Sequence, residues 1–386
     1  MRCALTPPSI SSEKPLSSTS LKIISGPLVA LIVAWYSNAS GLDFAATATL
    51  GITVCAIIWW VTEAVPIAVP ALLPLALFPA FGVLDKTQVS QAYGSHLVLL
   101  MLGGFTVSKA MERSNTHYHL ALMALHAVGG GSERRLVIGF MFAAAAISMW
   151  ISNTATTLML LPIAAAVLAT LPNNRLAAPL MLGIAYAANI GGIGTPVGTP
   201  PNLVFMQVYE DSFGRNVSFT QWMSWAMPIV IVLLPLTMFW LTRSLNQPLA
   251  AALPTKESWT IAQKRVMAVF CLTVLFWVTR REPFGGWSEW FNAPGATDAS
   301  VALMAMVLLF VLPDGKQGRL MDWQTVAKIP WDILILFGGG LCIAKGFSAS
   351  GLSEIIATQM QQFSQLPVIL LMFVLCLGVT LLTETT

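Results

Sequence analysis

The chain has 386 residues, of which 56% are hydrophobic and only 10% are charged, against roughly 25% charged residues in an average soluble domain. Together with a mean hydropathy of +0.74, this composition excludes an ordinary cytosolic protein. The apolar residues suffice for roughly nine or ten bilayer-spanning segments of about 20 residues each. A net charge of +3 is too small to indicate a nucleic-acid partner. The sequence therefore predicts an all-α, polytopic protein embedded in a lipid bilayer.

The first 20 residues are polar and rich in Ser and Pro, and they lack the basic start and apolar core of a cleavable signal. We interpret residues 1–20 as a disordered cytoplasmic tail. The five cysteines are scattered, with no C-x-x-C spacing, so the sequence predicts neither a disulfide framework nor a zinc site.

Apolar segments follow the tail, and all but two of them are interpreted as single crossings of the bilayer. Their approximate ranges are 21–36, 45–61, 64–84, 97–111, 136–171, 176–208, 222–241, 266–278, 299–312, 333–347 and 366–382. Two of these segments are too long or too irregular to be simple spans.

The segment 136–171 is too long for one ordinary crossing, and its middle carries the polar cluster ISNTATT. It predicts a re-entrant hairpin whose polar tip lies inside the protein at membrane depth. Ser, Asn and Thr also occur in ordinary membrane helices, where they bond to helix carbonyls or join helices. That simpler interpretation becomes weaker because a second irregular segment follows directly.

The segment 176–208 contains GGIGTPVGTPPN, and glycines and prolines at this density cannot continue a helix. Irregular backbone persists at membrane depth only where protein or a water-filled cavity satisfies its polar groups. A phosphate-binding loop is disfavoured because the segment has no Gly-Lys-Ser/Thr ending and no G-x-G-x-x-G. We expect an unwound helix, while a purely structural kink remains the alternative.

These two segments carry oxygen atoms without charge. Hydroxyls, an amide and unwound carbonyls suit a weakly held monovalent cation such as sodium, whereas calcium sites generally use carboxylates. Helix N-termini that open at the same break suit carboxylate or sulfate oxygens. One site can therefore hold a cation and an anion together, which gives their transport a physical basis for coupling.

The distribution of Lys and Arg tests the order of the spans, because cytoplasmic loops are enriched in them. With the N-terminus in the cytoplasm and 136–171 as a hairpin, four basic residues lie outside, namely Lys86, Arg215, Arg280 and Arg281. Fourteen lie inside, namely Arg2, Lys14, Lys22, Arg113, Arg134, Arg135, Arg175, Arg243, Lys256, Lys264, Arg265, Lys316, Arg319 and Lys328. This asymmetry supports the hairpin and a cytoplasmic N-terminus.

An internal repeat links the two halves. HLVLLMLGGFTVSKA aligns without gaps on DILILFGGGLCIAKG, matching Lys109 to Lys345 at a constant offset of 236 residues. Inverted repeats with discontinuous helices recur in secondary transporters, whose sites lie between the repeats. The same offset places a second hairpin tip near position 388.

Four segments together resemble the divalent anion to sodium symporter family, also called solute carrier family 13. They are MWISNTATTLMLLPIA, NIGGIGTPVGTPPNLV, WWVTEAVPIAVPALLPLALFPAFGVL and IPWDILILFGGGLCIAKG. The resemblance implies an elevator-type, usually homodimeric transporter of the cell (inner) membrane. Such a protein couples sodium to uptake of a small divalent anion, which can be a dicarboxylate, citrate or sulfate. We accordingly expect a transporter rather than an enzyme.

The resemblance also implies roles for particular residues and ranges. The first sodium site would use Ser148, Ser152, Asn153 and Gly198, and the anion would meet Asn153, Thr154, Thr199 and Pro200. No other metal is expected. The implied scaffold comprises mainly 21–134 and the second-repeat spans 211–330. The implied transport domain contains the hairpin and broken helix at 135–210, and 331–386 holds further second-repeat spans and the first arm of a second hairpin.

The family carries a second Ser-Asn-Thr tip, preceded by a stretch resembling the final residues Thr383-Glu384-Thr385-Thr386. The given sequence would then stop just before that tip, in agreement with the repeat offset. We interpret the sequence as a C-terminally truncated symporter and expect weak or no transport by residues 1–386 alone.

A proton-coupled permease or an anion exchanger of the same architecture is the main alternative, and a channel suits an enclosed polar tip less well. An intramembrane enzyme is disfavoured because the chain lacks G-x-S-x-G and H-E-x-x-H. Lys109 and Lys345 are expected to reach the membrane interface rather than the anion. His117, His119 and His126 are expected in a solvated cytoplasmic loop rather than a metal site.

Overall fold

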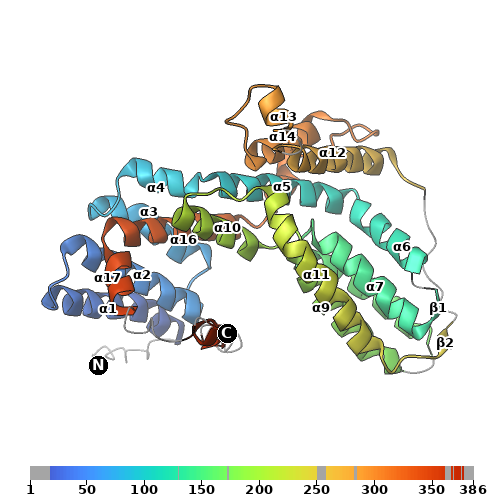
Figure 1. Ribbon diagram of the computed structural model, residues 1–386, viewed down its shortest axis with the longest axis horizontal. Helices are drawn as coiled ribbons and strands as arrows, with labels where there is room; N and C mark the ends of the chain where they lie inside the picture. Colours follow the sequence, from blue (N-terminus) through green and yellow to red (C-terminus); the bar gives the residue numbers. More distant parts are fainter. Residues whose placement is uncertain are drawn as a thin grey trace, which may run out of the picture. The chain divides into compact units, whose positions relative to one another are not determined.

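The computed structural model describes residues 18–128, 130–171, 174–249, 258–281, 285–360, 367, 369–374 and 376–377. Within these ranges the regular secondary structure is almost entirely helical (Figure 1). The helices form two compact units: unit 1 consists of Met1–Tyr93 with Ile335–Thr386, and unit 2 consists of Gly94–Leu334. Of the expected tail, only Ser18–Ser20 lie within the described residues, and they begin the first helix.

Unit 1 is built from apolar helices around a small buried core. The core centres on the fully buried Phe78, with Ile52, Val89 and Cys342 around it. The helices of this unit are α1 (Ser18–Ala39), α2 (Phe44–Thr62), α3 (Ala68–Ala80), α4 (Lys86–Tyr93), most of α16 (Trp331–Ala349) and α17 (Leu352–Met360).

Unit 2 holds the longer uninterrupted stretch of chain, and all of its larger elements are helices. They are α5 (His96–Arg113), α6 (Thr116–Val128), α7 (Glu133–Ser148), α8 (Asn153–Ala169), α9 (Ala177–Gly192), α10 (Pro200–Phe213), α11 (Phe219–Thr242), α12 (Ile261–Val278), α13 (Gly286–Trp290), α14 (Asp298–Val311) and α15 (Trp323–Val326), with the 3₁₀ helix η1 (Asn174–Leu176). Two short antiparallel strands, β1 (Gly131–Ser132) and β2 (Pro248–Leu249), pair Gly131 with Leu249.

Several helices carry the length and apolarity of bilayer spans. Within the described residues, α1, α2, α11, α12 and α16 are each long and apolar enough to cross a membrane. Large apolar side chains are exposed on them, for example Trp35 on α1 and Val232 and Phe239 on α11. Exposed apolar surface of this kind is stable in lipid but not in water. The predicted class, a polytopic helical membrane protein, is confirmed.

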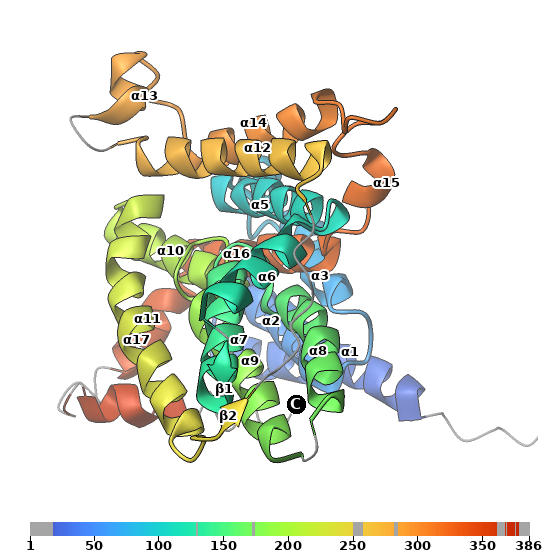
Figure 2. The same ribbon diagram turned by 90° about the vertical axis from the view of Figure 1, so that its right-hand side faces the viewer.

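The expected hairpin at 136–171 is present as α7, a short reversal and α8. The start of α7 lies near β2, because β1 directly precedes α7 and pairs with β2. The chain returns near the same place, because Arg175, just after α8, donates a hydrogen bond to the Ser244 carbonyl at 2.6 Å. Both ends of the hairpin therefore lie near the segment 244–249, and its tip lies about 24 Å away, the length of a 16-residue helix. Figure 2 shows α7, α8 and α9 side by side.

The expected unwound segment is also present. Helix α9 ends at Gly192 and α10 begins at Pro200, so seven residues of irregular backbone separate them. Pro200 and Pro201 occupy the first turn of α10, where their missing N–H groups cost no helical hydrogen bond.

One expectation for unit 2 is wrong. The histidines at 117, 119 and 126 lie on helix α6 rather than in a solvated loop, and His117 and His119 are buried. The helix follows α5 across a tight turn in which Asn115 has a left-handed backbone (φ +56°). Within the described residues, no cluster of three or more His, Cys, Asp or Glu side chains could hold a metal ion.

The internal repeat appears as a pair of matching helices. Shifted by 236 residues, α5 becomes 332–349, one residue from the bounds of α16. The repeated glycines are close-contact positions in both units: a Cβ on Gly103 would lie 2.5 Å from Ala302 Cβ on α14, and one on Gly339 would lie 2.6 Å from Ala71 Cβ on α3. Each repeat helix thus packs the first of the two matched glycines, Gly103 or Gly339, against an alanine of the other half of the sequence.

Candidate functional site

The hairpin tip is shaped by the end of α7 and the start of α8. The backbone N–H of Ile151 bonds back to the Ile147 carbonyl, which closes the last turn of α7. Ser152 then caps α8, its hydroxyl accepting from the Ala155 N–H at 3.3 Å. The backbone N–H groups of Asn153 and Thr154 have no acceptor among the described residues, as is usual in the first turn of a helix. The tip therefore presents free N–H groups at the positive end of a helix dipole.

The glycines of the broken helix are explained by close packing against this tip. A Cβ on Gly191 would overlap the backbone of Ala145, and one on Gly192 would lie 2.5 Å from Asn153 Oδ1. Gly194 lies against the Met149 side chain, and a Cβ on Gly198 would lie 3.0 Å from the Met149 carbonyl oxygen. A larger residue would overlap backbone atoms at Gly191 and Gly198 and a side chain of the tip at Gly192 and Gly194. The glycines therefore allow the break to lie directly on the tip.

Asn153 is the centre of the polar contacts at the tip. The hydroxyl of Ser148 donates to Asn153 Oδ1 at 2.5 Å, and Asn153 Nδ2 donates to Asn189 Oδ1 at 2.9 Å. This chain of hydrogen bonds joins α7, α8 and α9. Ser148 and Asn153 were predicted from the sequence, whereas Asn189 was not, because a single Asn in an apolar helix carries no distinctive pattern.

Asn202 and Thr195 hold the break in its shape. Asn202 is buried, and its Nδ2 donates to the carbonyls of Gly192 at 2.9 Å and Thr195 at 2.7 Å. The Thr195 hydroxyl donates to the Met149 carbonyl of the hairpin. These bonds satisfy carbonyls that the interrupted helix would leave unpaired. The structural role of Asn202 was also missed, although it lies in the motif that pointed to the break.

The predicted site residues come together at one cavity of about 890 Å³. Six of the seven line it, namely Ser152, Asn153, Thr154, Gly198, Thr199 and Pro200. Ser148, the seventh, lies behind them, bonded to Asn153. A volume of this size falls within the usual range for small-molecule sites. The geometry places these residues together, while their binding roles stay predictions.

The two helix starts at this cavity differ in what they offer. Helix α8 offers its dipole and the free N–H groups of its first turn. Helix α10 begins with two prolines and so lacks the corresponding donors, but its N-cap Thr199 makes no side-chain capping bond. Its hydroxyl is therefore available to a ligand.

Charged side chains at the cavity largely compensate one another. Lys109, which was expected to avoid the site, lines the cavity, and its Nζ lies 2.5 Å from Glu112 Oε2. Lys328 also lines it, and within the described residues its ammonium has no acidic partner. The cavity thus has a small positive excess that favours an anion. The expected second tip and Glu384 lie outside the described residues.

A hairpin and a broken helix that meet at a polar cavity, in a protein with several spanning helices, define a secondary membrane transporter. The sequence profile of the citrate transporter family matches residues 57–386. The chain is also 34% identical over 400 residues to "Sodium-dependent dicarboxylate transporter SdcS" of Staphylococcus aureus strains bovine RF122 / ET3-1, MSSA476 and NCTC 8325 / PS 47, covering 97% of this chain and 76% of each relative. The chain belongs to the citrate transporter family, and the resemblance to divalent anion to sodium symporters is confirmed.

Proposed function

We propose that this protein couples sodium entry to uptake of a divalent anion, a di- or tricarboxylate or sulfate, by alternating access. The observation that carries the proposal is the meeting of the Ser-Asn-Thr tip and the Gly-Thr-Pro break at one cavity. The sodium dependence and the dicarboxylate named for SdcS support the same function.

Sodium would be held by Ser148, Ser152, Asn153 and Gly198. All of these can supply neutral oxygen atoms, which suit a monovalent ion that must also be released. Ser148 and Asn153 already lie in contact through Oγ and Oδ1. The ion would take oxygen lone pairs that the present hydrogen bonds leave free, and its charge would favour an anion next to it.

The anion would be held by Asn153, Thr154, Thr199 and Pro200. Its oxygens would accept from the free N–H groups of α8 and from the Thr199 hydroxyl, since helix N-termini favour negative charge. Pro200 would contribute shape rather than a donor, because its nitrogen carries no hydrogen.

We further propose the cell membrane as the location, with the N-terminus in the cytoplasm, on the strength of the excess of Lys and Arg in the inside segments. The range 135–210 would be the moving part and 21–134 and 211–330 mainly the scaffold, in a homodimer of elevator type. Crosslinking between cysteines placed at 135–210 and in the scaffold, with and without sodium, would test the motion.

Equilibrium binding tests the site without requiring net transport. The purified 386-residue chain in nanodiscs is titrated with labelled succinate, citrate or sulfate in sodium or in choline. We expect binding in sodium only, and we expect Asn153→Ala to weaken it at least tenfold, about 1.4 kcal/mol or more. Asn38→Ala is the matched control, because Asn38 is exposed on α1.

Two outcomes would overturn the proposal. Equal binding in sodium and choline, with affinity that instead follows pH, would favour a proton-coupled permease. Unchanged sodium-dependent binding in Asn153→Ala would show that the cation lies elsewhere.

A further inference from the structure

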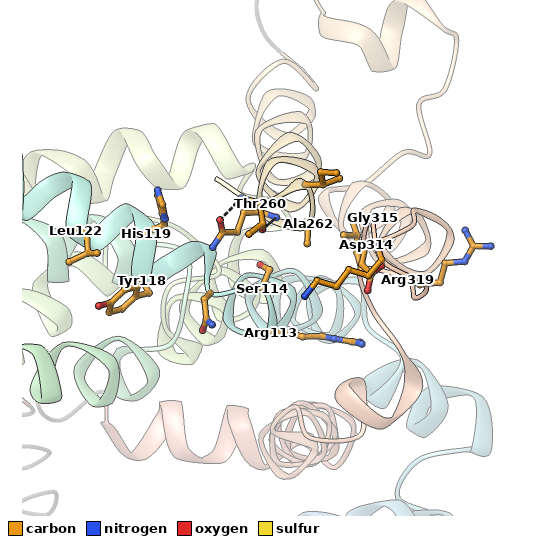
Figure 3. Close-up of a pocket in the computed structure, with 15 residues that line it drawn as sticks. Arg113, Ser114, Tyr118, His119, Leu122, Thr260, Ala262, Asp314, Gly315 and Arg319 are labelled. Atoms are coloured by element: carbon orange, nitrogen blue, oxygen red, sulfur yellow. Dashed lines mark hydrogen bonds between the residues drawn. The ribbon is translucent and has the colours of Figure 1, made fainter. Parts of the chain in front are cut away.

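A second cavity in unit 2, of about 570 Å³, also adjoins the C-terminal end of α5 and shares only Asn115 with the lining of the candidate site. Its walls come from the α5–α6 turn, the start of α12 and the loop between α14 and α15. Figure 3 shows Tyr118 and His119 on one side, Asp314 and Gly315 on the other, and Ser114 between them.

The start of α12 supplies hydrogen-bond donors to this cavity. Thr260 and Gln263 cap each other's backbone N–H, at 3.2 and 2.9 Å. The N–H groups of Ile261 and Ala262 lie between them and have no acceptor among the described residues. All four residues line the cavity. The positive end of an 18-residue helix thus opens onto it with two free donors.

The charges around the cavity leave an excess of one positive charge, because Arg113 is paired with Asp322 whereas the lining residues Lys316 and Arg319 are balanced only in part by the single carboxylate of Asp314. Arg113 forms an ion pair with Asp322 at 2.6 Å, and Arg319 donates to the Val311 carbonyl at 2.6 Å; Figure 3 shows its guanidinium pointing away from the other labelled side chains. Asp314 accepts from the backbone N–H groups of Lys316 and Gly318, at 2.7 and 3.1 Å. The Lys316 ammonium has no carboxylate within ion-pair distance in the described part of the chain.

The remaining wall is apolar and aromatic. Leu122, Leu320 and Ile261 line it with Tyr118. The imidazole of His119 lies against the indole of Trp259, with 4.6 Å between ring centroids. A small inorganic ion would leave most of this volume and all of this apolar wall uncovered.

We propose that this cavity binds a phosphate-bearing organic molecule, whose phosphate meets Lys316 and the N–H groups of Ile261 and Ala262 and whose apolar part covers Tyr118 and Leu122. Free N–H groups at a helix start and a lysine are the donors that phosphate groups commonly use. By the distribution of Lys and Arg the cavity faces the cytoplasm, so the molecule is a soluble phosphate ester or an anionic lipid of the inner leaflet.

The test measures binding to the purified 386-residue chain. In phosphatidylcholine nanodiscs the chain is titrated calorimetrically with AMP, which carries a phosphate and an aromatic base, and with inorganic phosphate. In a second arm its melting temperature is compared between phosphatidylcholine and phosphatidylglycerol nanodiscs. AMP binding stronger than phosphate binding indicates the soluble source, and stabilisation by phosphatidylglycerol indicates the lipid.

Variants connect either signal to this cavity. Lys316→Ala should weaken the binding or stabilisation at least fivefold, whereas Lys264→Ala should not, because Lys264 lies exposed on α12 and does not line the cavity. Ile261→Pro removes one N–H at a position where proline suits a helix start, and Thr260 already has the extended backbone that precedes a proline (φ −73°, ψ 163°). Ile261→Ala removes the isoleucine side chain but keeps the N–H, so the difference between the two variants measures the effect of the N–H donor. Ile261→Pro should weaken binding more than Ile261→Ala.

The proposal fails if neither AMP nor phosphatidylglycerol has an effect, or if the effect is the same in Lys316→Ala. Succinate binding at the candidate site, measured with Asn153→Ala, is independent of these results.

Discussion

The side chain of Asn202 donates hydrogen bonds to backbone carbonyls of the interrupted helix. The interrupted helix leaves the carbonyls of Gly192 and Thr195 without helical partners, and the Nδ2 group bonds both. Because the residue is buried, water offers little replacement.

Asn202→Leu should therefore destabilise the break. The leucine removes both bonds and leaves the buried Gly192 carbonyl unpaired, at a cost of about 1–3 kcal/mol, while the Thr195 carbonyl keeps the Gly198 N–H at 3.3 Å. Thermal unfolding in detergent should show a lower melting temperature, and Asn38→Leu, an exposed change, should show almost none. An unaltered melting temperature in Asn202→Leu would mean that the Gly192 carbonyl finds another partner.

His117 makes the α5–α6 turn sensitive to acid. Its Nδ1 donates to the Met111 carbonyl at 3.0 Å, and burial lowers the pKa of the imidazole from its ordinary value of 6.5. The folded protein favours neutral His117. The associated stability is fully present above about pH 6.5 and is lost as the pH falls from there through the folded pKa.

We expect the melting temperature to decrease between pH 7 and pH 5, and to decrease less in His117→Gln. His126→Gln serves as the control, because His126 lies on the same helix and is exposed. Equal acid sensitivity in wild type and His117→Gln would assign the effect to another group.

Much of the site could be predicted at the residue scale, for a physical reason. Ser, Asn and Thr within a long apolar run must find partners, so Ser152, Asn153 and Thr154 stood out. Asn189 did not, because its partner Asn153 is 36 residues away and only the fold brings them together. The Lys109–Glu112 pair shows the same limit, since the sequence could not show that the lysine lines the cavity.

At the scale of elements, glycine contacts decide how closely helices approach. Gly103 and Gly339 occupy the same repeat position, and each lies against an alanine of the neighbouring helix. Their neighbours differ: a Cβ on Gly104 would lie 3.1 Å from Val197, whereas nothing lies within 4 Å of one on Gly340.

Gly103→Ala and Gly339→Ala should each destabilise the protein by about 1–3 kcal/mol, because the added methyl forces α5 from α14 or α16 from α3. Gly340→Ala should be neutral or stabilising by up to about 1 kcal/mol, since alanine favours a helix and space is open. Chemical unfolding in mild detergent measures all three. Equal effects of Gly339→Ala and Gly340→Ala would contradict this packing.

Elements with a strong apolar or polar signal were predictable, and weaker ones were not. The hairpin was predicted from the length of its apolar segment, and the break was predicted from its Gly and Pro content. Helix α6 did not, because its 13 residues include three histidines and are too few for a span. Its burial against α7 and the start of α12 turns a polar-looking stretch into part of the core.

At the scale of a whole unit, a buried ion pair joins three helices. Arg280, just after α12, donates through Nε to Asp298 Oδ1 at 2.5 Å, and both side chains are almost fully buried. Asp298, at the start of α14, also accepts from the Phe219 N–H of α11 at 3.1 Å. Phe219 stacks between Trp277 and Trp150, the latter at the hairpin tip. The tip is therefore supported by this pair.

Arg280→Met should cost about 3–5 kcal/mol, because it leaves the Asp298 carboxylate buried without its cation. Arg281→Met, at the exposed next position, should change stability little. Unfolding followed by tryptophan fluorescence reports on Trp277 and Trp150 directly. Similar curves for the two variants would show that Asp298 is neutral or hydrated in the fold.

Unit 2 is one continuous stretch of chain, whereas unit 1 is assembled from both ends of the sequence. During synthesis, the residues up to Tyr93 enter the bilayer before α16, which carries Gly339 and Cys342 into their core. Until then Ala71 and Phe78 lack part of their final surroundings. The first helices therefore remain in the lipid, or beside an insertion factor, without α16 while the middle of the protein is translated. The rate of translation, rather than the folding rate of its own helices, then limits how fast unit 1 is completed.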